Sequence, residues 1–179
     1  MLKINYRIVD DFNVLKSISS NIFNSEYSHI TGFIEILFGS HNEDCYYHEN
    51  PLQEGETGGE LLDWWLNLAI DVINCLPEKK YVAFQEPETF NRWLEFKLEG
   101  DNVIIDIAID KTENNDKSFI TEPYNEFRYV EPTNFSVKFS QFKNEVISTA
   151  NRFITELESI NPELLKTKMV AELLNKLKS

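Results

Sequence analysis

Three residues of one loop have the side chains and spacing of a metal site. His41, Cys45 and His48 form a His-x3-Cys-x2-His pattern, and imidazole nitrogen and thiolate sulfur both suit zinc or a similar ion. A structural zinc site takes four ligands, so a fourth would have to come from a carboxylate of the same loop or from His29. A polar loop with exposed histidines would have the same composition. We predict neither a metal nor another cofactor, and keep a metal-binding protein or small metal-dependent enzyme as the alternative function.

The sequence has few features that would indicate other kinds of catalysis. It contains no glycine-rich phosphate loop, nucleophile elbow or His-Glu-x-x-His pattern. Carboxylate pairs such as Asp106 and Asp110 occur at strand spacing, but such pairs are expected by chance in a chain with 30 acids. A two-metal nuclease would also need a basic groove for its substrate. We therefore expect a protein without catalytic activity.

The distribution of charge is the most informative feature. Between Lys16 and Lys79 there is no Lys or Arg, while the same stretch holds eleven acids. That stretch has a formal charge of −11 out of −13 for the whole chain. A surface of one sign attracts an oppositely charged protein and speeds its association, whereas nucleic acids and anionic membranes require positive potential. We predict a cationic protein partner; high solubility alone is the other explanation.

Aromatic residues lie among these acids. Tyr46 and Tyr47 belong to a long loop predicted over 39–59, and Trp64 begins the helix that follows. Tyrosine and tryptophan are enriched at protein interfaces. Trp64 lies about 100° around the helix from the apolar stripe that includes Trp65, so it is a candidate exposed anchor, although two core aromatics would fit the same pattern. The predicted partner-binding residues are Glu43, Asp44, Tyr46, Tyr47, Glu49, Glu54, Glu56 and Trp64.

The length and composition predict one globular domain over 1–179. Of the 179 residues, 42% are hydrophobic and 26% are charged, which excludes disorder and an integral membrane protein. The N-terminal residues lack the apolar segment of a signal peptide, and no apolar run approaches the ~20 residues needed to span a bilayer. With only two cysteines, no disulfide framework is indicated. The expected location is the cytoplasm.

Residue periodicity predicts the elements that position these side chains. Alternation indicates strands over 2–8, 93–98 and 103–109. An apolar run indicates a strand over 33–38, and 81–85 is a further strand candidate. A hairpin turn is expected at Gly100, and one or two later strands around Phe127 and Val137. Three strands in a row imply antiparallel pairing. The predicted class is therefore α+β, with a mainly antiparallel sheet, an amphipathic central helix and two C-terminal helices.

The central helix is predicted over 60–76. Leu68 and Val72 lie on its apolar stripe, Thr57 has capping-box spacing to Glu60, and Pro77 should end the helix. Residues 12–25 are ambiguous between helix and loop. Two C-terminal helices are expected, one capped by Ser140 and a second restarting at 161–163 with an Asn cap and a proline at its first position. The predicted core combines Leu68, Val72, Phe96, Ile105, Ile107 and Phe153.

The strand around 32–36, the acidic loop, the helix with Trp64 and Trp65, and the hairpin over 93–109 together resemble small bacterial immunity proteins that neutralise polymorphic toxins. The resemblance is one of pattern over most of the chain and transfers no functional residue. It implies a cytoplasmic, non-catalytic protein that binds one cognate toxin. Many such toxins are cationic nucleases, whose phosphate-binding surface an acidic face would cover. An accessory module without a ligand is a third interpretation.

Overall fold

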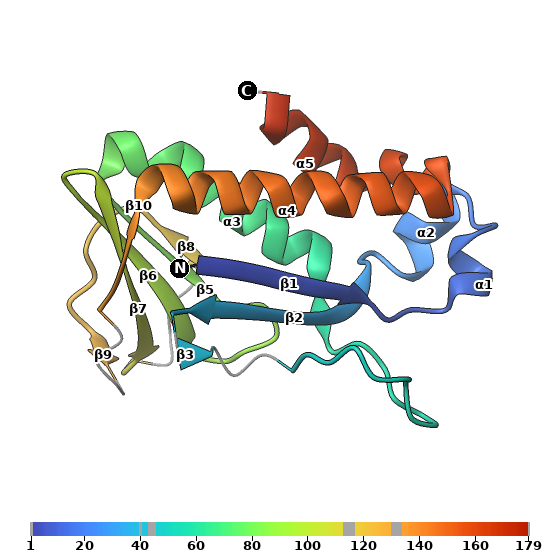
Figure 1. Ribbon diagram of the computed structural model, residues 1–179, viewed down its shortest axis with the longest axis horizontal. Coiled ribbons are helices and arrows are strands. Elements are labelled where there is room, and N and C mark those ends of the chain that lie inside the picture. Colours follow the sequence, from blue (N-terminus) through green and yellow to red (C-terminus); the bar gives the residue numbers. More distant parts are fainter. Residues whose placement is uncertain (1, 40, 43–45, 113–116, 130–133, 179) are drawn as a thin grey trace.

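The computed structural model describes residues 2–39, 46–112, 117–129 and 134–178, together with the backbone of 41–42. Two antiparallel sheets lie beside a layer of helices (Figure 1). In the first sheet, β2 (Thr31–Phe38) pairs with β1 (Leu2–Ile8) on one side and with β3 (His41–Asn42) and β4 (Glu60–Leu61) on the other. The second sheet has the order β10-β7-β6-β5-β8, with β9 also paired to β7.

The second sheet contains the predicted hairpins. Its strands are β5 (Tyr81–Gln85), β6 (Arg92–Glu99), β7 (Asn102–Asp110), β8 (Phe119–Ile120), β9 (Phe127–Tyr129) and β10 (Phe135–Lys138). A turn at Gly100, with φ +58°, joins β6 to β7 as expected. Every strand pair described is antiparallel. The predicted α+β class is confirmed, although the strands form two sheets rather than one.

Helix α3 (Leu62–Lys79) is central to the hydrophobic core. Its apolar side chains join those of both sheets, α4 (Phe139–Ile160) and α5 (Lys168–Lys178) in one buried cluster. Two short helices, α1 (Phe12–Leu15) and α2 (Ser20–Glu26), close one end of it. The predicted core residues Leu68, Val72, Phe96, Ile105 and Phe153 are buried in this cluster, and Ile107 packs against it only partly buried.

Both predicted boundaries of the central helix are wrong. Thr57 does not cap it, because Glu60 and Leu61 pair with β2 as strand β4, and the helix begins only at Leu62, whose N–H donates to Ile30 O. Pro77 lies inside the last turn, and the helix ends at Lys79. A proline has no backbone N–H, so one hydrogen bond of the helix is missing at Pro77. Only Glu78 and Lys79 follow it in the helix. Lys80, with φ +62°, terminates the helix.

The C-terminal helices also begin differently from the prediction. Ser140 does not cap α4, which starts at Phe139 because the N–H of that residue donates to Asp101 O in the β6–β7 turn. The Asn161 side chain accepts from Glu163 N, as a cap should, but it opens only a 3₁₀ turn (Pro162–Lys166). Helix α5 follows at Lys168. No helix in the described part of the chain has the length and apolar character needed to cross a bilayer.

Helix α4 is fastened to the free edge of β1. Glu145 accepts a hydrogen bond from Ile4 N at 2.9 Å, and Arg152 donates to Ile4 O at 3.1 Å. The Tyr6 hydroxyl donates to Glu156 at 3.0 Å, and the Arg152 guanidinium lies over the Tyr6 ring. Side chains of α4 thus satisfy backbone groups that an edge strand would otherwise offer to another chain. The long loop lies on the side of the first sheet opposite α4 (Figure 1).

We expect Leu68→Ala to lower the free energy of unfolding by about 2–5 kcal/mol, because it removes buried methyl groups from the main cluster and leaves a cavity. Leu52→Ala, the same change at a loop position that is 43% exposed, should cost less than about 0.5 kcal/mol. Urea unfolding of both variants measures the difference. A loss below about 1 kcal/mol for Leu68→Ala would contradict the placement of the apolar face of α3.

Candidate partner-binding site

The loop over 46–59 covers the outer face of the first sheet. Arg7 and Phe33 are direct neighbours across β1 and β2 and point away from the main core. The Phe33 ring is 1% exposed because the rings of Tyr46 and His48 pack on it, with centroids 5.0 and 5.1 Å away. Arg7 donates to His48 O at 3.0 Å and to Asn50 O at 2.6 Å. The sheet therefore holds this loop by an aromatic contact and by a guanidinium.

Glu56 ties the two ends of the loop together. One carboxylate oxygen accepts from the Tyr46 hydroxyl at 2.8 Å and lies 2.7 Å from His48 Nε2, and the other accepts from Gln53 N at 2.8 Å. The backbone N–H of Gln53, followed by His48 and Tyr46, lowers the pKa of Glu56 to about 2. Glu56 is therefore ionised at neutral pH and works within the loop, rather than pointing towards a partner.

Gly58 lets the loop return closely against the sheet. Gly58 lies on the backbone of Gly32 and Val9, so a methyl group at position 58 would collide with Gly32 and approach Val9 O to 2.7 Å. The next residue, Gly59, has open space where a side chain would be. The close backbone contact at Gly58 fixes where the loop ends and β4 begins.

The outward side of the loop carries several of the predicted partner-binding residues. Tyr46 is 59% exposed, Glu49 and Glu54 are exposed, and Tyr47 is half-buried with its hydroxyl donating to Glu49 at 3.0 Å. Leu52, which the sequence analysis did not single out, is exposed beside them. Glu43 and Asp44 lie outside the described residues. The loop thus presents acids and one aromatic ring on a fixed backbone.

Of the three ligands of the alternative metal site, only His48 has a described side chain. His48 Nε2 is engaged by Glu56, and His48 Nδ1 is buried without a hydrogen-bond partner among the described residues. Cys45 and the side chain of His41 lie outside the described residues. Among the side chains that are described, no group of three His, Cys, Asp or Glu residues could hold a metal ion.

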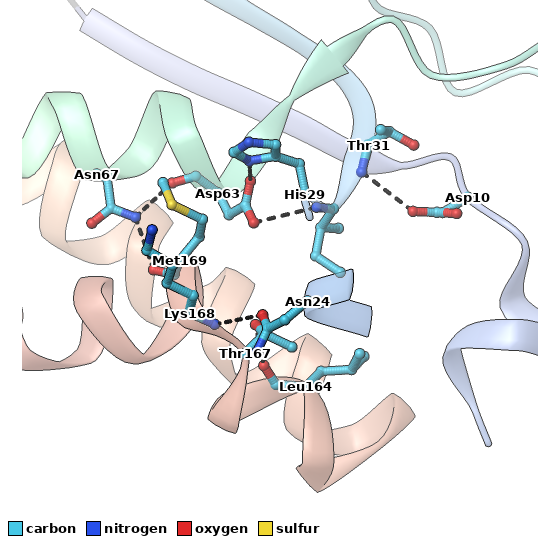
Figure 2. Close-up of polar contacts among 11 residues, drawn as sticks. Asp10, Asn24, His29, Thr31, Asp63, Asn67, Leu164, Thr167, Lys168 and Met169 are labelled. Carbon is cyan, nitrogen blue, oxygen red and sulfur yellow. Dashed lines mark hydrogen bonds and ion pairs between the residues drawn. The ribbon is translucent and has the colours of Figure 1, made fainter. Parts of the chain in front are cut away.

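The start of α3 contains a buried carboxylate, Asp63, which contacts His29 (Figure 2). Asp63 is fully buried, lies 3.0 Å from His29 Nδ1 and accepts from Ile30 N at 3.3 Å. Burial raises the pKa of Asp63, against the opposing effect of these hydrogen bonds. The His29 ring stacks on Trp64 with centroids 5.7 Å apart. Trp64 is half-buried against the main core, so only part of its ring is available to a partner.

The same junction reaches the C-terminal helix. The Asn67 amide donates to Asp63 O and to Met169 O, both at 2.9 Å, and so joins α3 to α5 (Figure 2). On the other side of α3, the Trp65 indole N–H donates to Glu60 at 2.8 Å. Glu60 therefore acts within the fold like Glu56, and neither is a free surface acid.

Carboxylates of the second sheet are also occupied by the fold. Glu95 and Asp106 face each other across β6 and β7, and Lys97 Nζ lies 2.6 Å from the first and 3.7 Å from the second. The Tyr129 hydroxyl donates to Glu95 at 3.0 Å. Asp110, paired with Asp106 in the sequence analysis, accepts from Thr112 N and Thr112 Oγ1, each at 2.8 Å. These contacts offset part of the cost of burying the charges, although Asp110 Oδ2 is buried without a hydrogen-bond partner among the described residues.

Comparison with known proteins gives no assignment: the chain matches no protein-family model, no curated protein and no solved structure. The function has to be inferred from the chain's own residues. Among those described, the outward side of the loop over 46–59 differs most from an ordinary surface, because it combines a long segment without secondary structure, a fixed conformation and unpaired acids.

Gly58→Ala should lower the free energy of unfolding by about 1–3 kcal/mol, because the added methyl group has to displace backbone atoms. Amide hydrogen exchange over 46–57 should accelerate at the same time. Gly59→Ala, the same change one residue along, should stay within about 0.5 kcal/mol of wild type. Equal effects of the two substitutions would contradict a close contact specific to Gly58.

His29 should make stability depend on pH near neutrality. Its hydrogen bond to Asp63, assisted by the charges of Asp63 and Glu88, raises the pKa of His29 above its usual value of 6.5. A group with a raised pKa in the folded state stabilises fully below its unfolded pKa, and that contribution is lost as the pH rises through the folded pKa. His29→Gln keeps a hydrogen-bond donor but cannot titrate.

We expect the difference in unfolding free energy between wild type and His29→Gln to be larger at pH 6 than at pH 8.5. Urea unfolding at both pH values measures it. A difference that is the same at the two pH values would show that the His29 charge is not coupled to Asp63.

Proposed function

We propose that this chain is a non-catalytic binding protein that neutralises a basic protein, and that the loop over 46–59 is its main contact. The observation that carries the proposal is that different residues of this loop hold its conformation and face solvent. Glu56, His48 and the underlying Arg7 hold its conformation, while Glu49 and Glu54 are exposed. The contacts that stabilise the loop leave these two acids on its outward side.

Electrostatics favours a cationic partner. Glu49 and Glu54 form no ion pair with any described residue, and the nearest Lys or Arg along the chain are at positions 16 and 79. Arg7 approaches the loop but donates to backbone carbonyls. Uncompensated charges of one sign on a surface speed the encounter with the opposite sign and disfavour acidic partners.

The fixed conformation of the loop favours binding over a loose solubilising tail. Ordering a flexible loop on association costs free energy, and a loop that is already ordered avoids that cost. The exposed ring of Tyr46 belongs to this surface and offers apolar area to a partner. The half-buried Trp64 lies at the start of the helix that follows the loop and β4. An acidic segment that served solubility alone would not need to be attached to the sheet at both ends.

The resemblance to immunity proteins suggests the kind of partner. A toxin with a cationic active surface, such as a nuclease-type toxin in the bacterial cytoplasm, would be occluded by a rigid acidic face. The proposal includes no enzymatic step, cofactor, direct contact with nucleic acid or membrane.

Glu49→Lys combined with Glu54→Lys should lower the association rate with the partner about tenfold and reduce its dependence on salt, because steering is lost. The partner is obtained by pull-down from the native organism and identified by mass spectrometry, and its binding kinetics are measured at two salt concentrations. Folding stability should change by less than about 0.5 kcal/mol.

The control is Glu158→Lys with Glu172→Lys, which changes net charge equally on α4 and α5, on the opposite side of the molecule. It should leave the association rate closer to wild type than the loop variant does. An acidic partner, or a loop variant that associates as fast as wild type, would refute the electrostatic basis of the proposal.

A further inference from the structure

Phe90 is the most exposed large apolar side chain among the described residues, at 86%. It lies in the loop that joins β5 to β6. Isolated apolar residues on a surface are common, but they ordinarily lie flat against neighbouring side chains or on loose segments. Phe90 is unusual because its backbone is held firmly while its ring remains in solvent.

A network of hydrogen bonds fixes this loop. The Gln85 amide donates to Thr89 O at 2.8 Å and to Phe90 O at 2.9 Å, and the Thr89 hydroxyl donates to Glu86 O at 2.8 Å. Glu86 is 6% exposed and forms an ion pair with Arg92 at 3.0 Å. This network holds the backbone at residue 90 in a defined position relative to the sheet, and the Phe90 side chain extends from it into solvent.

The loop also contains an unfavourable backbone conformation. Glu88 has φ +61°, a left-handed conformation that is unfavourable for a residue with a side chain. The hydrogen bonds around it keep this conformation, yet the Phe90 ring adds little to the core. The structure therefore maintains a costly turn that exposes a phenylalanine.

This turn lies beside the surface described above. The Glu88 carboxylate is close enough to His29 to contribute to its raised pKa, and His29 stacks on Trp64. Trp64 in turn follows β4, where the loop over 46–59 ends. Glu88, His29 and Trp64 thus link the β5–β6 turn to the start of α3, the helix that follows the acidic loop and β4.

We propose that Phe90 is the apolar anchor of the interface and inserts into an apolar pocket, rimmed by Lys or Arg, on the basic partner. This inference rests on the proposed function and names the residue that holds the partner after electrostatic encounter. Glu88 is exposed next to Phe90, while the charge of Arg92 is compensated by Glu86. The ring is therefore flanked by negative charge, and a basic rim complements it. An aromatic residue whose backbone is ordered before binding loses little conformational entropy when the complex forms.

The test places p-benzoylphenylalanine, a photoreactive phenylalanine analogue, at position 90 in the native organism. The matched control places it at position 12, where another phenylalanine is 39% exposed. Crosslinking at position 90, but not at 12, should give the same basic protein that the pull-down identifies, joined through an apolar segment flanked by Lys or Arg. No crosslink above the control, an acidic protein, or a second copy of this chain would overturn the inference.

Kinetics with that partner then separate the anchor from steering. Phe90→Ala should raise the dissociation rate about 30-fold, as expected for a hot-spot residue, and change the association rate less than about twofold. Phe12→Ala should change neither rate. Because Phe90 is exposed, thermal unfolding of Phe90→Ala should match wild type.

The two proposals fail in different ways. If Phe90→Ala leaves the dissociation rate unchanged while charge reversal in the loop slows association, the anchor is refuted and the proposed function stands. If Phe90→Ala speeds dissociation but charge reversal has no effect on association, the basic character of the partner is refuted, and with it the occupant proposed for the Phe90 site.

Discussion

Asp63 has no contact with solvent, so its carboxylate has to be satisfied by groups of the protein. His29 and the N–H of Ile30 do so from the residues that lead into β2, and the Asp63 backbone carbonyl accepts from Asn67, whose amide also reaches α5. A buried carboxylate that loses one of its partners is strongly destabilised. This requirement fixes the start of α3 against the start of β2, and through Asn67 the same junction is joined to α5.

The net charge of the central segment overstates the charge that its surface can use. Of its eleven acids, Glu56 holds the loop, Glu60 accepts from Trp65, Asp63 is buried and Asp71 is paired with Lys176 at 2.7 Å. The charge pattern correctly drew attention to this region, but a count of acids cannot separate those that stabilise the fold from those that face solvent. Glu49 and Glu54 face solvent, while Glu56 makes the contacts that order the loop.

The elements that depend on interactions between near neighbours in the chain could be predicted from the sequence. Alternation located β1, β6 and β7, and the apolar stripe located the body of α3, because both patterns depend only on near neighbours. The element ends were missed where distant groups replaced a local cap, as at Leu62 with Ile30 O and at Phe139 with Asp101 O. The contacts that hold the loop were missed for the same reason: Arg7 lies 41 residues from His48. An outward phenylalanine at position 33 was the one available sign that something covers that face of the strand.

The two parts of the proposed interface belong to different sheets, and this has a mechanical consequence. The acidic loop is attached to β1 and β2, whereas the Phe90 turn is built on β5 and β6. Steering by one and anchoring by the other require a constant distance between them, which a flexible connection would not give. The shared core around α3, to which strands of both sheets contribute buried side chains, supplies that rigidity. A partner that contacts both parts would therefore depend on the relative position of the two sheets as much as on any single side chain.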